Sequence, residues 1–158
     1  MGMGERLIGV DVGGTKVSVA VLEDGVLSDP VLSATEQSSS EALVDQLAMA
    51  IEDAGPADAV GIGVPSVIDF ATGTARTSVN IPLQGVPLRQ QLSERVGIPV
   101  FVDNDATAAA LAEAHDDDLN LIAQSLVMIT VGTGVGGGIV LSGRIYRGAT
   151  GAAPVAPR

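Results

Sequence analysis

The chain has 158 residues and a formal net charge of −11, and 46% of its residues are hydrophobic although only 2% are aromatic. This acidity argues against a nucleic-acid interface, which needs a basic patch, and no apolar run approaches the ~20 residues that span a bilayer. The N-terminus has no signal-peptide pattern, and the absence of cysteine excludes disulfide bonds and weakly favours the cytoplasm. We therefore expect a cytoplasmic protein of one domain, or one and a fraction, without nucleic-acid or membrane partners.

The first elements of the chain form a predicted hairpin. Alternating apolar residues indicate strands near Leu7–Asp11 and Lys16–Leu22, and the paired glycines Gly13 and Gly14 lie between them. Paired glycines also let backbone N–H groups approach a phosphate without a Cβ in the way. Taken alone, however, such a turn is more often only a tight connection between strands.

A third strand and a helix follow. The strand is expected over Val26–Thr35, after a turn at Asp24-Gly25. Ser38 and Glu41 have the spacing of a capping box, which predicts that a helix begins there and continues through Ala54. Apolar residues recur on one face of this helix, as they do when a helix packs on a sheet.

The remaining elements alternate between strand and helix before a second hairpin appears. They are a strand over Val60–Val64, a helix over Leu88–Val96, a strand over Pro99–Val102, a helix over Ala106–Ala114, and a hairpin of Val127–Val131 with Gly138–Leu141. This order predicts an α/β fold. His115 is expected to be a helix-end residue and the acidic run over 116–118 a solvated loop, not a metal site.

Polar residues lie at one junction between a predicted strand and a predicted helix. Asn104 and Asp105 follow an apolar run and precede an alanine-rich helix. A carboxylate at this position can face a ligand, and the N-terminus of the helix favours its negative charge. The alternative is that both residues only cap the helix, which contributes ~1 kcal/mol.

Two familiar phosphate motifs nearly match and are rejected. The segment from Gly9 to Gly14 has P-loop spacing, but Thr15-Lys16 reverses the required order and no helix follows. The run over 132–137 satisfies GxGxxG, yet a strand follows it where a dinucleotide site needs a helix. The glycine turns therefore need another explanation.

Taken in order, the motifs resemble those of the ROK family (repressor, open reading frame, kinase), which includes bacterial glucokinases. The similar segments lie at 11–16, 61–65, 78–82, 104–105, 132–138 and 143–148, so the resemblance covers roughly residues 6–151. It implies an α/β fold of the actin-like ATPase (ribonuclease H-like) type. The first lobe would span residues 1–118, and residues 119–158 would begin a truncated second lobe with its opening β-hairpin.

The resemblance also implies an activity and its residues. The protein would transfer a phosphoryl group from ATP to the 6-hydroxyl of a hexose, with glucose as the first choice and Mg²⁺ as cofactor. Asp105 would be the general base, and Asn80, Asn104 and Asp105 would bind the hexose. The nucleotide would be held by Asp11, Gly13, Gly14, Thr15, Gly132, Thr133 and Gly134, with Asp11 also binding Mg²⁺ through water.

The sequence departs from the family pattern in two places. Ser66 stands where the family often has glycine, which affects an expected contact on the sugar side. The family's Gly-Glu-x-Gly-His segment and its structural zinc site would lie beyond Arg158. We therefore expect the isolated chain to be inactive and its tail beyond about residue 119 to be poorly packed, whereas the parent protein would be a homo-oligomer.

Two other functions stay open. One is a sugar-responsive transcriptional regulator of the same family, which carries a winged-helix domain ahead of the first phosphate loop, where about ten residues precede Asp11 here. The other is a non-catalytic actin-like binding module, in which Asn104 and Asp105 would only cap a helix.

Overall fold

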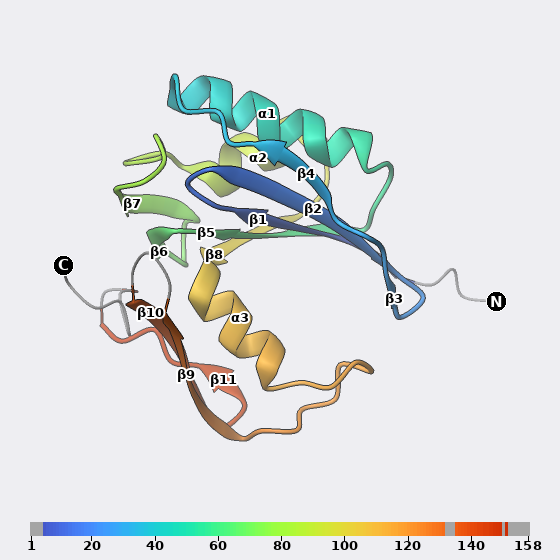
Figure 1. Cartoon of the computed structure of the whole chain (residues 1–158), viewed down its shortest axis with the longest axis vertical. Helices are drawn as coiled ribbons and strands as arrows, with labels where there is room; N and C mark the ends of the chain where they lie inside the picture. The colour runs from blue at the N-terminus through green and yellow to red at the C-terminus, as the bar shows by residue number, and fades with distance from the viewer. Residues whose placement is uncertain (1–4, 132–134, 150, 152–158) are drawn as a thin grey trace.

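A six-stranded sheet forms the centre of the structure, a computed structural model that describes residues 5–131, 135–149 and 151 (Figure 1). Its strands lie in the order β3-β2-β1-β5-β8, and β4 also pairs with β2. Strands β1, β5 and β8 are parallel, whereas β2 is antiparallel to β1. The bounds are β1 (Arg6–Val12), β2 (Lys16–Glu23), β3 (Val26–Leu27), β4 (Val31–Ala34), β5 (Ala59–Val64) and β8 (Val100–Asn104).

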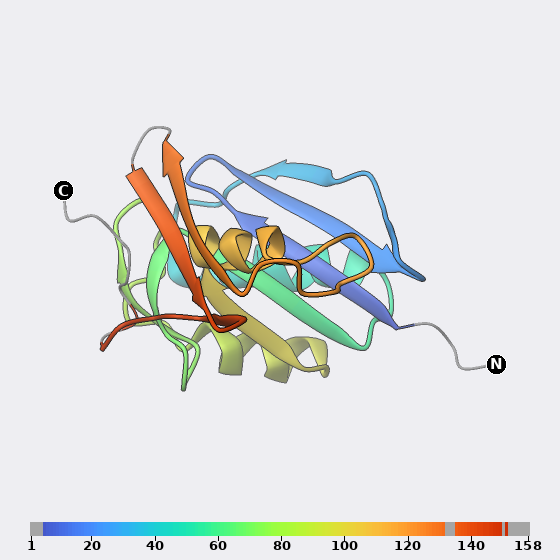
Figure 2. The same ribbon diagram turned by 90° about the horizontal axis from the view of Figure 1, so that it is seen from below.

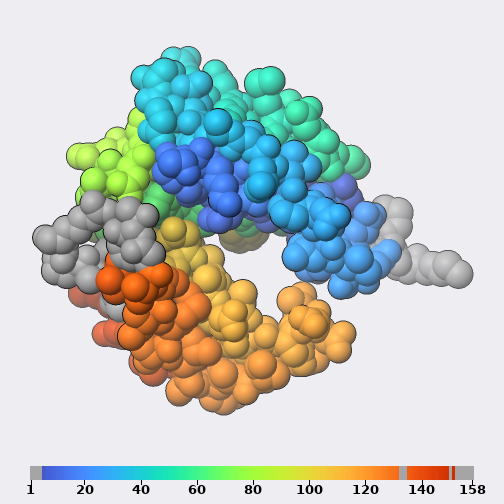
Figure 3. All heavy atoms as spheres, viewed as in Figure 1, coloured from blue at the N-terminus to red at the C-terminus, as the bar shows by residue number. Residues whose placement is uncertain are grey.

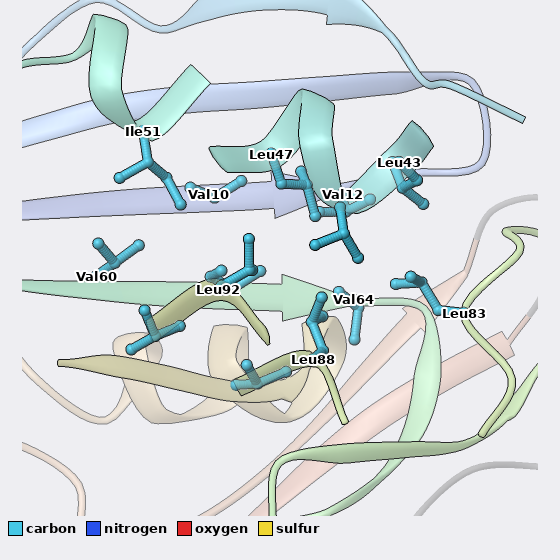
Figure 4. Close-up of a cluster of buried hydrophobic side chains, with 14 of the residues drawn as sticks. Val10, Val12, Leu43, Leu47, Ile51, Val60, Val64, Leu83, Leu88 and Leu92 are labelled. Atoms are coloured by element: carbon cyan, nitrogen blue, oxygen red, sulfur yellow. The ribbon is translucent and has the colours of Figure 1, made fainter. Parts of the chain in front are cut away.

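Helices cover both faces of this sheet. Helices α1 (Ser40–Asp53) and α2 (Leu88–Val96) lie on one face, and α3 (Asp105–Glu113) lies on the other (Figures 1 and 2). Alternate residues of β1 point toward α1, so that Val10 and Val12 are buried while Asp11 between them is exposed. Figure 4 shows Leu43, Leu47 and Ile51 of α1 pointing into this apolar layer. The α/β prediction is confirmed.

Two local predictions were wrong in detail. The strand expected over Val26–Thr35 is divided into β3 and β4, with Pro30, which lacks the N–H that a ladder needs, between them. Helix α1 is capped by Ser39, whose side chain accepts a hydrogen bond from the Ala42 N–H at 3.1 Å. The capping box at Ser38 therefore does not form.

The sequence did not predict the hairpin of β6 (Ser66–Asp69) with β7 (Thr74–Ser78). Its strands are short and β7 is mostly polar, so they lack the apolar alternation that identifies a strand. The turn contains Gly73 with a φ of 70°, in the left-handed region that glycine adopts readily. This hairpin leads directly into the segment that carries Asn80.

A second, three-stranded sheet follows α3. It consists of β9 (Ser125–Val131), β10 (Val135–Leu141) and β11 (Arg144–Ile145), in the order β11-β10-β9. One face packs closely on α3, because a Cβ built on Gly138 would lie 2.2 Å from the Ala110 Cβ. The sequence analysis expected the chain beyond about residue 119 to be poorly packed, but this face of the second sheet packs closely on α3.

The other face of the second sheet is apolar and open, as the sequence predicted. Val127 and Ile129 are each 68% exposed, and Val131 is 81% exposed. The predicted division between residues 118 and 119 falls in the loop that connects α3 to β9, and it stays a prediction. Among the helices in the described part of the chain, none combines the length and the apolar character that spanning a bilayer requires.

Candidate functional site

The predicted catalytic residues lie at the carboxyl ends of the parallel strands. Asp11 of β1 is paired in register with Gly63 of β5, and Gly63 is paired with Asp103 of β8. Asp105 begins α3 immediately after β8. A Cβ on Gly63 would lie 3.3 Å from the Asp105 Cα, so glycine here leaves room for the first turn of α3. Open α/β sheets bind ligands at this edge.

The first glycine turn is fixed by its neighbours. The Gly13 N–H donates to the Lys16 carbonyl at 2.8 Å, and a Cβ on Gly13 would lie 3.1 Å from that oxygen. The Thr35 hydroxyl donates to the Gly13 carbonyl at 2.8 Å. Thr15 itself is exposed. The turn is therefore held in place from one side and open on the other, which suits a phosphate cradle.

Asn80 lies against this turn. A Cβ on Gly14 would approach the Asn80 Cβ to 3.5 Å. The Gln37 side-chain amide donates to the Gly14 carbonyl at 2.6 Å and to the Asn80 carbonyl at 3.3 Å. The fold thus brings together two motifs that are far apart in the sequence. Gln37, which joins them, was missed because nothing in the local sequence marks it.

Asn104 is the N-cap of α3. Its side chain is 8% exposed, its Oδ1 accepts from the Thr107 N–H at 3.1 Å, and its Nδ2 donates to the Ser66 carbonyl at 3.3 Å. The capping interpretation is confirmed for this residue, and its contact with a sugar stays a prediction. The Ser66 hydroxyl is also used within the protein, because it donates to the Ser78 hydroxyl at 3.0 Å. Ser66 thus helps to hold the segment before Asn80.

Asp105 has an electrostatic environment that differs from the expected one. Burial raises the pKa of the Asp105 carboxyl above its usual range, and the nearby Asp11 carboxylate raises it further. The Ala106 N–H, which donates to Oδ1 at 2.8 Å, opposes this shift in pKa. We expected the helix N-terminus to favour the ionised form, but burial outweighs it. A raised pKa brings a general base closer to neutral pH, where base catalysis is most effective.

The raised pKa predicts that Asp105→Asn stabilises the fold at neutral pH, by on the order of 1 kcal/mol. The Asp105 side chain of the wild type contributes fully to the free energy of unfolding below the unfolded-state pKa of an aspartate. This contribution is lost as pH rises through the raised folded-state pKa of Asp105. The stability advantage of Asp105→Asn should therefore grow over that interval and then level off. Urea unfolding of both chains from pH 3 to pH 8 measures it, and a constant difference between them would contradict this account.

The remaining predictions for the site concern ions and the second glycine turn. In the part of the chain that the structure describes, no three His, Cys, Asp or Glu side chains gather to hold a metal ion. Asp11 is an exposed single carboxylate, which fits Mg²⁺ because this ion usually keeps several waters and binds through one or two carboxylates and phosphates.

The predicted phosphate contacts of Gly132, Thr133 and Gly134 lie outside the described residues. Asp116 accepts hydrogen bonds from the N–H groups of Asp118 and Asn120, as a solvated loop would.

The sequence and the fold both match known sugar kinases. The glucokinase of Streptomyces coelicolor is 36% identical over 151 residues, which cover 92% of this chain and 47% of the relative. The structure of the ROK hexokinase of Thermus thermophilus matches with a TM-score of 0.79 and 41% identity, over 92% of this chain and 50% of that one. A Streptomyces griseus ROK glucokinase, solved with glucose and AMPPNP, matches with a TM-score of 0.81 and 35% identity, over 92% and 47%.

These matches show the actin-like ATPase fold of the ROK sugar kinases. The chain spans about half the length of the relatives it matches. The xylose repressor of Caldicellulosiruptor bescii is also similar, with 37% identity over 92 residues, which cover 58% of this chain and 23% of that protein. The profile of the ROK family matches residues 7–156. This chain therefore belongs to the ROK family.

Proposed function

We propose that the protein transfers the γ-phosphoryl group of ATP to the 6-hydroxyl of a hexose, with glucose as the first choice. The observation that carries this proposal is the position of Asp105, which is partly buried at the N-terminus of α3, at the edge of the sheet where β1 carries Asp11. Asn80 lies against the first glycine turn, because a Cβ on Gly14 would lie 3.5 Å from the Asn80 Cβ. Glucokinases among the relatives support the same activity.

In this reaction Asp105 accepts the proton of the sugar hydroxyl while the hydroxyl oxygen attacks the γ-phosphorus. The new O–P bond forms while the bond from the γ-phosphorus to the bridging oxygen breaks, and ADP leaves. Phosphoryl transfer depends mostly on positioning and charge neutralisation, so backbone N–H groups of Gly13, Gly14 and Thr15 are suited to hold phosphate oxygens. Mg²⁺, bound near Asp11 through water, would neutralise phosphate charge. Asn80 would bind sugar hydroxyls, because an amide both donates and accepts.

The activity can be tested with the chain joined to the second half of the Streptomyces coelicolor glucokinase, which we name the extended protein. We expect one of glucose, N-acetylglucosamine, N-acetylmannosamine and fructose to stabilise it most, by about 2.7 kcal/mol at a concentration a hundredfold above Kd. Thermal shift measures this effect, and ADP release with the same sugars measures turnover. The Asn80→Ala variant should lose the shift but keep its stability, because Asn80 is exposed. The absence of a shift and of turnover with every sugar would contradict the proposal.

A transcriptional regulator is the second candidate, because of the similarity to the Caldicellulosiruptor bescii xylose repressor. Such a protein would bind a sugar without consuming ATP. Sugar binding by the extended protein without hexose-dependent ADP release would favour this alternative. Homo-oligomeric assembly of the parent protein and a cytoplasmic location stay expectations from the sequence.

A further inference from the structure

The segment after β11 is joined to the central sheet by one arginine. Arg147 Nη2 lies 2.5 Å from Asp103 Oδ2, and Arg147 Nε donates to the same oxygen at 3.2 Å. Both side chains are partly buried, at 26% and 19% exposure. An ion pair that is shielded from water and made through two N–H groups is stronger than a single exposed contact.

The same arginine packs on an aromatic ring. The Arg147 guanidinium carbon lies 3.6 Å from the centre of the Phe70 ring, which is within the range of a cation–π interaction. Phe70 follows β6, and Arg89 holds this turn by donating to the Ala71 carbonyl at 3.0 Å. Farther along the chain, a Cβ on Gly151 would lie 2.5 Å from the Ile68 carbonyl, so the chain itself runs against β6.

Asp103 connects this ion pair to the candidate site. Its Oδ1 accepts a hydrogen bond from the Asn104 N–H at 2.9 Å, while its Oδ2 forms the ion pair with the Arg147 guanidinium. Asn104 in turn caps α3, whose first residue is Asp105. A continuous set of contacts therefore leads from the segment after β11 to the proposed base.

We propose that Arg147 is a positioning residue for phosphoryl transfer. It fixes the Asp103 carboxylate, and through it the backbone at Asn104 and Asp105, while it ties the second sheet to the first. This inference rests on the proposed function. Loss of Arg147 would also leave the Asp103 carboxylate without its cationic partner, in a chain that already has 19 acidic and only 8 basic residues.

The first test measures the contacts directly in the 158-residue chain. Arg147→Met keeps much of the side-chain length but removes the charge and the planar fork. We expect the amide ¹H–¹⁵N resonances of Asn104 and Asp105 to move in Arg147→Met and to move clearly less in Arg144→Met. Arg144 is the matched control, because it is exposed on β11 and forms no salt bridge with a described residue. Equal movement in the two variants would overturn the proposed link.

The second test measures turnover in the extended protein. Arg147→Met should lower kcat by about 10- to 100-fold while the KM values for hexose and ATP change less than about threefold. Arg147→Lys, which keeps the positive charge, should lower kcat less than Arg147→Met does. The double variant Asp103→Asn with Arg147→Met should lower kcat by a smaller factor than the product of the factors for the two single variants, because no unpaired carboxylate is left.

The outcomes separate this proposal from the proposed function. An active extended protein whose Arg147→Met variant changes only KM, or changes nothing, would overturn the role of Arg147. An inactive extended protein would overturn the proposed function instead, and the amide resonances would then decide the link between Arg147 and Asp105. If Arg147→Met does not fold, Arg147→Lys carries the same comparison.

Discussion

Asp105→Asn is expected to lower kcat of the extended protein by about 100- to 10,000-fold. Asparagine has nearly the same shape and can still accept the hydrogen bond from the Ala106 N–H, so the start of α3 should persist. It cannot accept the proton of the attacking hydroxyl. The KM values should change little, because the substitution removes an interaction made mainly in the transition state.

Steady-state ADP release with glucose and ATP measures this effect. Asp117→Asn is the matched control, because it makes the same chemical change at an exposed position in the loop after α3. The wild-type kcat should fall on the acidic side with a midpoint above the usual range of an aspartate, because burial raises the pKa of Asp105 and the base must be ionised to act. Turnover of Asp105→Asn within tenfold of the wild type would show that another group is the base.

The 158-residue chain by itself is expected to show no steady sugar-kinase turnover. Transfer requires aligned reactants in a site closed against water, and the chain spans about half the length of relatives that carry out this reaction. Its second sheet also has an open apolar face, on which Val131 is 81% exposed. Within the described residues β9 is an edge strand, and open edges favour association between chains.

Two measurements on the purified chain test this expectation. ATP- and hexose-dependent ADP release should stay at background, and size-exclusion chromatography should show species larger than a monomer. Replacing Val127 and Ile129 with threonine should reduce association, because both side chains lie on the open face and threonine keeps the β-branched shape. Steady turnover that Asp105→Asn abolishes would show that these 158 residues are sufficient for catalysis.

Local patterns predicted most of the secondary structure and failed where the pattern was weak. Alternation identified β1 and β5, because alternate side chains of both strands are buried in one apolar cluster, and the sequence also predicted the helices at α2 and at the alanine-rich α3. The β6–β7 hairpin was not predicted, since its short polar strands bury little apolar surface. The predicted cap of α1 was wrong by one residue, because three consecutive serines can each accept a hydrogen bond from the first turn of a helix and Ser39 is the one that does so.

The sequence by itself determined the family, the two glycine turns and the junction at Asn104 and Asp105, because these depend on residue types at short, fixed spacings. Only the tertiary structure decided which groups surround Asp105 and that burial raises its pKa. The same holds for the contacts of Asn104 with Ser66 and of Arg147 with Asp103, which join residues 38 and 44 positions apart. Such contacts depend on how the sheets and helices pack, and no local pattern of residues encodes that packing.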